Sequence, residues 1–214
     1  MSATKFRCIV ADPPWQFGDS LPGPGRGARK HYRTLCVDEM CALQPYRALA
    51  MEAPDAVLFL WRVSSMPEEP LRLARSWGFT VKAEIVWEKT TRRLELQHVR
   101  ALQALLARAR TERERRALRR GIELLSEPRT DHFGMGHYVR HAHETCLVCV
   151  RGKPQILNHS TRSRFRAPVG AHSDKPEAFY KLVEKLVPGP RLELFARRHR
   201  RGWTCLGDEL GVAA

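Results

Sequence analysis

Four consecutive residues, Asp12-Pro13-Pro14-Trp15, carry the clearest chemical signal in the sequence. They directly follow the apolar stretch 6–11, which we predict to be a buried strand. Proline has no backbone N–H and a fixed φ, so the two prolines end the strand ladder and leave carbonyl groups without internal partners. We therefore expect the Asp12 carboxylate and the Pro13 carbonyl to form two fixed acceptors beyond the carboxyl end of a strand, where open α/β sheets bind ligands.

Two acceptors at a fixed separation suit the two hydrogens of a planar amino group, such as the exocyclic amine of adenine. The lone pair of that nitrogen is delocalised into the ring, which makes it a poor nucleophile. Acceptors that pull on both hydrogens favour a tetrahedral nitrogen, whose lone pair can attack a sulfonium methyl group in line. Holding both reactants in a water-poor site accelerates the transfer further. Trp15 offers an aromatic surface for a base that has been flipped out of a duplex.

The alternative interpretation of the motif is a plain turn in which Asp12 caps the next element. The buried strand before the motif and the aromatic residue at its end favour the chemical interpretation.

Short apolar runs rich in β-branched and aromatic residues predict the strands that position this motif. Their near-continuous apolarity is typical of strands covered on both faces, as in a parallel sheet. The predicted strands are 6–11, 56–61, 81–87, 145–150 and 191–196. Helices are predicted between them at 37–49, 67–77 and 175–187, the last with Asp174 as its N-cap. Strands that alternate with helices indicate an α/β domain of doubly wound type.

Residues 91–130 differ from the rest of the chain in composition. They contain eleven arginines and five acidic residues, so about +6 of the formal net charge of +14 lies in this stretch. Leucines recur at helical spacing, and Thr111 to Glu114 resembles a capping box. We predict two helices that form a hairpin inserted into the α/β domain. Its charge either keeps a protruding hairpin soluble or grips phosphates or a partner subunit, and the sequence favours neither.

The 214 residues suffice for one domain, 1–214, that includes the insertion 91–130. The net charge of +14 favours an anionic partner such as nucleic acid. The chain shows no signal peptide and no apolar run of membrane-spanning length, so we expect no membrane association. The six cysteines lack the dense spacing of a secreted disulfide framework, which predicts a cytoplasmic location.

Cys146 and Cys149, with His141 and His143 upstream, resemble a zinc site only superficially. Residues i and i+3 of a strand face opposite sides, so the two sulfur atoms are badly placed to share a metal. We predict no metal site. The sequence also has no G-x-G-x-x-G or Walker loop, so nothing in it supports nicotinamide or nucleoside-triphosphate binding.

A series of short motifs runs along the chain in a characteristic order. They are residues 11–15 (ADPPW), 31–35 (HYRTL), 38–40 (DEM), 58–61 (LFLW), 77–79 (WGF), 85–89 (IVWEK), 143–147 (HETCL), 151–154 (RGKP), 172–177 (HSDKPE), 192–197 (LELFAR) and 203–210 (WTCLGDEL). In this order they resemble the family of the catalytic subunit of the eukaryotic mRNA adenosine methyltransferase and its bacterial and phage relatives, many of which modify adenine in DNA. The resemblance covers nearly the whole chain except residues 91–130.

The resemblance implies a Rossmann-like fold with permuted motif order, dependent on S-adenosylmethionine. It has a mostly parallel central sheet with helices on both faces, plus the helical insertion. By position, Asp12 would contact both the substrate amine and the cofactor. The other residues implied in cofactor binding are Lys175, Arg197, His199, Arg200, Asp208 and Glu209. Lys175 also lies at a predicted helix N-terminus, which favours an anionic carboxylate.

Tyr32 falls where the family has an aromatic residue in its first substrate loop. Glu144 either steadies the target base or only neutralises nearby arginines. Eukaryotic members tend to carry amides where this chain has Arg200, Asp208 and Glu209.

The sequence therefore predicts a methyltransferase acting on the N6 amino group of adenine in nucleic acid. DNA is favoured over RNA, because the chain has no recognisable RNA-binding module and resembles bacterial and phage members. A catalytically silent nucleic-acid scaffold and a methyltransferase of protein side-chain amides are the alternatives. The apolar stripes of the insertion also allow a homodimer.

Overall fold

The strands form one mixed sheet in the order β5-β3-β4-β2-β1-β6-β7. The bounds of the strands are β1 Cys8–Ala11, β2 Ala56–Arg62, β3 Thr80–Thr90, β4 His143–Arg151, β5 Arg164–Pro168, β6 Arg191–Leu194 and β7 Thr204–Leu206. Strand β1 pairs in parallel with β2 and β6, and β6 pairs in parallel with β7. Strand β4 runs antiparallel to β2. The α/β fold expected from the sequence is confirmed, and β5 and β7 are additions that the sequence did not predict.

The computed structural model describes residues 5–16, 34–51, 53–91, 96–126, 132–134, 138–170 and 174–211. These residues belong to two compact units. The first unit comprises Met1–Val86, Glu144–Arg164 and Tyr180–Ala214, and the second comprises Trp87–His143 and Phe165–Phe179. The predicted insertion 91–130 thus lies inside a larger second unit.

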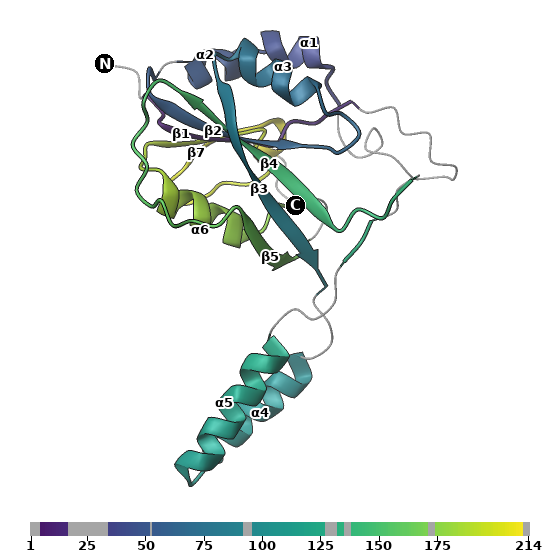
Figure 1. The fold of residues 1–214 in the computed structure, drawn as a ribbon, viewed down its shortest axis with the longest axis vertical. Helices are drawn as coiled ribbons and strands as arrows, with labels where there is room; N and C mark the ends of the chain where they lie inside the picture. Colours follow the sequence, from purple (N-terminus) through teal and green to yellow (C-terminus); the bar gives the residue numbers. More distant parts are fainter. Residues whose placement is uncertain are drawn as a thin grey trace. The chain divides into compact units, whose positions relative to one another are not determined.

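Helices cover both faces of the sheet in the first unit. Their bounds are α1 Val37–Ala42, α2 Tyr46–Met51, α3 Glu69–Ser76 and α6 Glu177–Leu186. Helices α1 to α3 lie on one side of the sheet and α6 lies on the other (Figure 1). All of Cys8–Ala11 and the first six residues of β2 are buried. Coverage on both faces explains why these strands are continuously apolar rather than alternating.

The single helix predicted at 37–49 is wrong, because the structure has two helices there. The first helix begins at a capping box, in which the Glu39 N–H donates to Cys36 Sγ and the Cys36 N–H donates to the Glu39 carboxylate. Pro45 separates α1 from α2. Proline cannot donate the helical hydrogen bond and its ring clashes with the preceding turn, so the helix stops and restarts. Helices α3 and α6 each begin two residues later than predicted.

Arg151, at the end of β4, connects the sheet to the ends of helices α2 and α3. Its guanidinium donates hydrogen bonds to the carbonyl groups of Ala50, Ala53 and Trp77, and it lies over the Phe79 ring with 4.4 Å between the Cζ atom and the ring centroid. These carbonyls terminate or follow α2 and α3, where backbone acceptors have no helical partner. The RGKP motif is therefore structural at its first residue.

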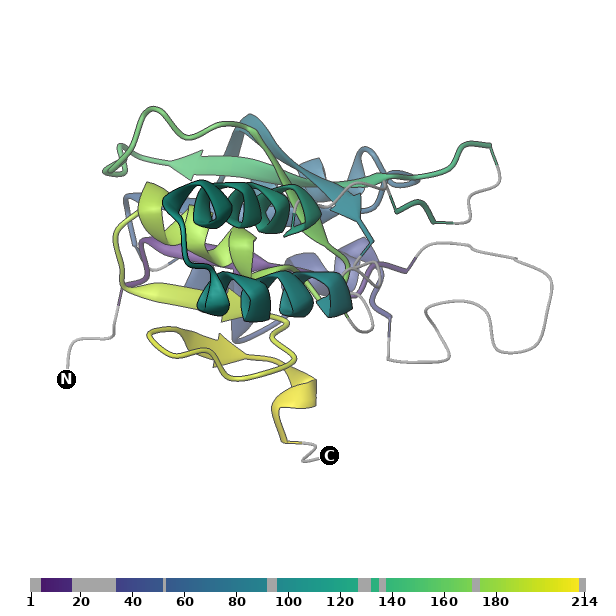
Figure 2. The same ribbon diagram turned by 90° about the horizontal axis from the view of Figure 1, so that it is seen from below.

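The second unit contains the predicted helical hairpin, formed by α4 Leu96–Arg108 and α5 Glu112–Ser126. The two helices lie side by side in both views (Figures 1 and 2). The predicted capping box is confirmed, since the Glu114 N–H donates to Thr111 Oγ1 at 3.2 Å and the Thr111 N–H donates to the Glu114 carboxylate at 3.0 Å. The backbone N–H groups of Thr111 and Arg110 both donate to the Glu114 carboxylate and lower its pKa. None of the described helices is long and apolar enough to cross a membrane.

Candidate active site at the carboxyl ends of the strands

The strand register places the predicted functional residues of the first unit along one edge of the sheet. Ala11, the last residue of β1, pairs with Leu60 of β2 and Leu194 of β6, and Leu194 pairs with Leu206 of β7. Residues that follow β1, β6 and β7 therefore emerge at the same edge. Strand β4 is antiparallel, and Thr145 pairs with Arg62, so the start of β4 lies at this edge too.

Asp12 follows β1 and lies between the other predicted residues along this edge. Glu144 stands at the start of β4, two strands away on one side, and Asp208 follows β7, two strands away on the other. Because neighbouring strands are about 4.8 Å apart, each of these distances across the sheet is roughly 10 Å. Arg197 and His199 follow β6, which is directly adjacent to β1. Along this edge, Asp12 therefore lies between Glu144 and the predicted cofactor-binding residues that follow β6 and β7.

The backbone around the prolines forms more hydrogen bonds within the protein than the sequence predicted. The Trp15 N–H donates to the Pro13 carbonyl at 2.9 Å, and the Leu35 N–H donates to the Pro14 carbonyl at 2.9 Å. The Gln16 N–H donates to the Leu35 carbonyl at 3.1 Å, completing a parallel bridge between Trp15 and Leu35. The expectation of carbonyls without internal partners is therefore wrong. Because a carbonyl oxygen has two lone pairs, Pro13 keeps acceptor capacity for a substrate amine.

Trp15 is an anchor of the motif rather than an open surface. Its side chain is only 3% exposed, and its indole N–H donates to the Trp61 carbonyl at 3.0 Å. A ring this deeply buried offers no free face to a base, so the predicted stacking role of Trp15 is not supported. The indole instead fixes the chain that follows Asp12 against β2.

Replacing Trp15 by Phe should lower the free energy of unfolding by about 1–3 kcal/mol, because the Trp61 carbonyl loses its donor inside the protein. Urea denaturation followed by circular dichroism measures this loss. Tyr138→Phe is the matched control, because Tyr138 is 99% exposed and should leave stability unchanged. A Trp15→Phe protein within 0.5 kcal/mol of wild type, on the order of the scatter for neutral surface changes, would contradict the anchoring role.

Beside Asp12 lies a buried polar cluster that the sequence analysis missed. Tyr180 of α6 donates its hydroxyl to Glu193 Oε1 of β6 at 2.5 Å. The Arg200 guanidinium lies 3.3 Å above the centre of the Tyr180 ring, and its Nε is 3.6 Å from Glu193 Oε2. Both charged side chains are only 10% exposed. The signal in the sequence was Glu193 itself, a carboxylate within the otherwise apolar strand 191–196.

The electrostatics of this cluster reach Asp12. Burial raises the pKa of Glu193, while the Tyr180 hydroxyl and the Arg200 charge lower it and the negative charge of Asp12 raises it. Burial likewise raises the pKa of Tyr180, with Glu193 and Asp12 adding to the shift. Two carboxylates therefore lie within electrostatic range of each other, and the Arg200 cation offsets part of their mutual repulsion.

The position of Arg200 supports a structural role rather than the predicted contact with the cofactor. Its guanidinium is held inside the protein by Tyr180 and Glu193. The Trp203 ring meets Tyr180 edge-on at 5.6 Å between centroids, and its N–H donates to Glu184 Oε1 at 2.7 Å. These contacts fasten the segment after β6 to α6. Arg200 therefore positions that segment, which also carries Arg197 and His199.

The segments after β6 and β7 are held closely together. A Cβ atom at Gly207 would lie 2.1 Å from the Ala196 carbonyl oxygen, so only glycine permits this approach. Phe195 adopts a φ of 60°, a conformation that is strained for a bulky residue and is concentrated at functional sites. Its ring stacks on Tyr46 with 4.7 Å between centroids. Burial raises the pKa of Tyr46, and the Asp208 charge adds to this, which puts Asp208 near the same aromatic pair.

The donors at this edge fit the chemistry of S-adenosylmethionine. The cofactor combines an α-carboxylate, cationic ammonium and sulfonium groups, and a ribose diol. Arg197 and His199 supply cationic or N–H donors, while Asp12 and Asp208 supply carboxylates for cations and hydroxyl groups. Arg197 is half-buried, and His199 and Asp208 are exposed.

The remaining predicted residues are placed less completely. Lys175 belongs to the second unit, precedes α6 and is 9% exposed, which is unusual for a lysine. Glu144 is half-buried in β4. Tyr32 lies outside the described residues, as does the side chain of Glu209, whose backbone belongs to the short helix η2 Asp208–Gly211.

Cys146 and Cys149 are both free and fully buried. Burial raises the pKa of Cys149 to about 12, which keeps the thiol protonated and unreactive. No group of residues suited to holding a metal occurs in the described part of the chain.

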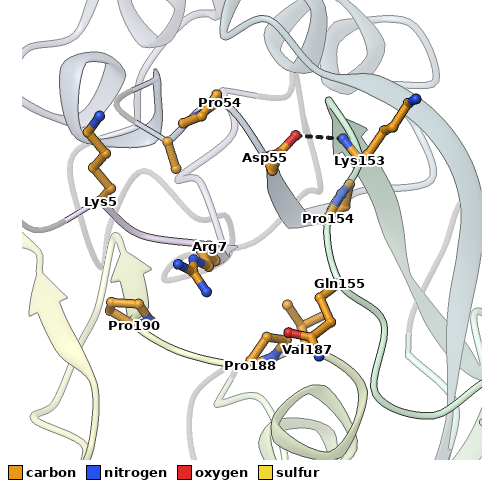
Figure 3. Close-up of a pocket in the computed structure, with 11 residues that line it drawn as sticks. Lys5, Arg7, Pro54, Asp55, Lys153, Pro154, Gln155, Val187, Pro188 and Pro190 are labelled. Atoms are coloured by element: carbon orange, nitrogen blue, oxygen red, sulfur yellow. Dashed lines mark hydrogen bonds between the residues drawn. The ribbon is translucent and has the colours of Figure 1, made fainter.

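A cavity of about 570 Å³ lies at the opposite edge of the sheet. Its lining includes Arg7 just before β1, Asp55 just before β2 and Pro190 just before β6 (Figure 3). The Asp55 carboxylate accepts a hydrogen bond from the Lys153 backbone N–H at 2.7 Å. These residues stand at the amino ends of the parallel strands, where α/β sheets do not place their active sites. The cavity is therefore distinct from the candidate site.

Comparison with known proteins identifies the same family as the order of the sequence motifs. The MT-A70 family profile matches residues 6–114 and 122–209. The human N(6)-adenosine-methyltransferase catalytic subunit METTL3 is 31% identical over 210 residues, covering 96% of this chain and 28% of METTL3. The Drosophila melanogaster MT-A70-like protein is 31% identical over 212 residues, covering 96% of this chain and 27% of that protein. The type II methyltransferase M.MunI of a Mycoplasma species is 24% identical over 226 residues, covering 96% of this chain and 78% of M.MunI.

The chain spans about a quarter of the length of the plant and animal relatives it matches. The profile match nevertheless extends over most of the chain and includes Asp12 to Trp15, the polar cluster and the segment after β7. The protein therefore belongs to the MT-A70 family.

Proposed function

We propose that this protein transfers a methyl group from S-adenosylmethionine to the N6 amino group of adenine in nucleic acid, and that its substrate is DNA. One observation carries the proposal: Asp12 stands at the carboxyl end of β1, between Glu144 on one side and the segments after β6 and β7 on the other. A carboxylate in this place can reach both a substrate amine and a cofactor, as methyl transfer requires.

The cofactor would supply an electrophilic methyl group activated by a neighbouring positive charge. The chain's own residues orient the acceptor. The Asp12 carboxylate and the Pro13 carbonyl accept the two amino hydrogens and concentrate electron density on N6. As the nitrogen gains a bond it becomes more acidic, and Asp12 is placed to accept the proton that is lost. By the family resemblance, Lys175 and His199 would bind the methionine carboxylate of the cofactor, and Arg197, Asp208 and Glu209 would line its ribose and adenine.

Glu144 and Tyr32 are proposed to hold the target base. Trp15 contributes by fixing the backbone of the motif through its contact with Trp61. Arg200 contributes by holding the cofactor segment in place through Glu193 and Tyr180.

The net charge supports nucleic acid as the substrate, and two findings support DNA in particular. The net charge of +14 suits a polyanion. The match to the type II methyltransferase M.MunI covers 78% of that protein. The family resemblance includes bacterial and phage members that modify adenine in DNA.

Incubation with tritium-labelled S-adenosylmethionine tests the proposal. We expect label in duplex DNA that contains adenine, with at least tenfold less label in single-stranded RNA of the same sequence. Preferential labelling of RNA would overturn the DNA assignment but not adenine methylation. Calorimetry with the unlabelled cofactor separates the enzyme from a silent scaffold, because a scaffold would bind DNA without taking up the cofactor. Label in protein glutamine or asparagine would support the amide methyltransferase instead.

A further inference from the structure

The apolar residues of α4 and α5 pack against one another within the hairpin. Val99, Leu102 and Leu106 on α4, and Leu118, Ile122 and Leu125 on α5, recur at helical spacing and are all half-buried. A Cβ atom at Gly121 would lie 3.3 Å from Leu102 Cδ1, so the two helices approach closely at this glycine. Among the described hairpin side chains, Leu105 is the single exposed large apolar residue.

An arginine row lies on the side of α5 away from this apolar stripe. With about 100° of rotation per residue, Leu118, Ile122 and Leu125 lie within about 60° of one another. Arg113, Arg116 and Arg120 lie within about 60° of one another in the opposite direction. All three side chains are exposed. The row points away from α4, because the apolar stripe of α5 packs toward it.

The arginines of the row differ from their neighbours on the same helix. Arg115 and Arg119 each share the Glu112 carboxylate, with N–O distances of 3.6 Å and 3.8 Å. No ion pair joins Arg113, Arg116 or Arg120 to another described residue. The described hairpin, residues 96–126, contains eight arginines and three glutamates. A row kept only for solubility would need neither this excess of one sign nor this alignment.

The spacing of the row matches a nucleic-acid strand. At about 1.5 Å of rise per residue, Arg113 and Arg120 are separated by about 10 Å along the helix axis. Successive phosphates of one DNA strand advance by about 3.4 Å along the duplex, so about three intervals cover the same length. Arginine pairs with phosphate oxygens through two parallel N–H groups. A second copy of the chain fits this face poorly, because it is highly cationic and its apolar residues are already packed.

We propose that Arg113, Arg116 and Arg120 bind three phosphates within a stretch of about four along one strand of the nucleic acid that the enzyme modifies. The identity of this ligand rests on the proposed function. The hairpin therefore acts as an arm that adds affinity without reading sequence, because contacts to phosphates carry no base information.

The test is the salt dependence of binding, measured by fluorescence anisotropy with a 30-base-pair duplex and the full chain. We expect the triple change Arg113→Gln, Arg116→Gln and Arg120→Gln to weaken binding tens to hundreds of times near 0.1 M salt. The slope of log K against log salt should become shallower by about 2 to 3, because each phosphate contact contributes about 0.9. The corresponding triple change to Lys should keep most of the slope, because it keeps the charges.

A matched control removes three positive charges elsewhere. Changing Lys5, Arg7 and Lys153 to Gln alters the net charge equally at the opposite edge of the sheet, where these exposed residues line the cavity in Figure 3. This control should leave the salt slope within about 1 of wild type. An unchanged slope in the arginine-to-glutamine protein, or an equal change in the control, would overturn the arm.

Two further readouts separate the arm from other outcomes. Sedimentation velocity should give the same oligomeric state for wild type and the glutamine variant. A dimer that dissociates on substitution, with the salt slope retained, would make the row a subunit interface and overturn the proposal. Tritium transfer to saturating DNA should persist in the variant. If the wild-type protein binds DNA but transfers no methyl group, and the glutamine variant still binds DNA more weakly, the proposed function fails while the proposed arm stands.

Discussion

Changing Asp12 to Asn should lower kcat for adenine methylation by at least about 10²–10³-fold while the protein stays folded. The side chain keeps its size, but one oxygen acceptor becomes an N–H donor that faces the substrate amine. The amino hydrogens are then no longer drawn by two acceptors, and no carboxylate remains to take the proton that N6 loses. Single-turnover kinetics with preformed protein–cofactor–DNA complex measure this loss directly.

Two controls make the Asp12 result specific. Asp38→Asn changes an exposed carboxylate on α1 that is paired with Arg72, and should leave kcat within about twofold. Circular dichroism and thermal melting should show that the Asp12→Asn protein is folded. If it retained more than a tenth of wild-type kcat, Asp12 would not be a catalytic residue.

Changing Arg200 to Met should lower the free energy of unfolding by about 3–5 kcal/mol, because it strands one member of a buried ion pair. Glu193 would keep its Tyr180 hydrogen bond but lose its cationic neighbour, and Tyr180 would lose the guanidinium stacked on its ring. Guanidinium chloride denaturation measures the loss. In the double variant Arg200→Met with Glu193→Leu, we expect much of the stability to return, since neither charge is then left unpaired in the interior.

The Arg200 effect should also depend on pH in a defined direction. The pKa of Glu193 is raised in the folded protein. Protonation of Glu193 therefore contributes its whole stabilising free energy at pH values below 4.5, the ordinary pKa of a glutamate. That contribution is lost as the pH rises through the folded-state pKa. Arg200 lowers this pKa, so its removal moves the pKa further upward. The deficit of Arg200→Met should therefore be smallest near pH 4 and grow toward neutral pH. A deficit that shrinks as the pH rises would contradict the pairing with Glu193.

Hydrophobic patterning was sufficient to predict the central strands and the placement of Asp12. Runs such as 56–61 are apolar without alternation, which only a strand covered on both faces requires. Because the carboxyl ends of parallel strands share one edge, Asp12 and Arg197, which follow two of these runs, could be expected at the same edge. The hairpin could be predicted for a similar reason, since its helical spacing and the Thr111 capping box are local signals.

Other features depend on contacts between distant residues and have no local signal. Strand β7 is three residues long, and only its pairing with β6 makes it a strand. Trp15 is buried and donates its indole N–H to the Trp61 carbonyl, 46 positions away, whereas the sequence predicted an open aromatic surface. Arg200 lies in a basic segment, and its place over Tyr180 depends on how α6 packs beside β6. The position of Pro45 did carry a local signal, which the single helix predicted at 37–49 ignored.

Identifying the methylated atom tests the proposed methylation of adenine N6 most directly. Adenine-containing duplex DNA is incubated with S-adenosylmethionine carrying a trideuterated methyl group, digested to nucleosides and analysed by mass spectrometry. The proposed function predicts N6-methyldeoxyadenosine with the deuterated methyl group from the wild-type protein, and a loss of at least about 10²-fold with Asp12→Asn. A deuterated methyl group on a ring nitrogen or on cytosine, or equal N6 methylation by the Asp12→Asn protein, would contradict it.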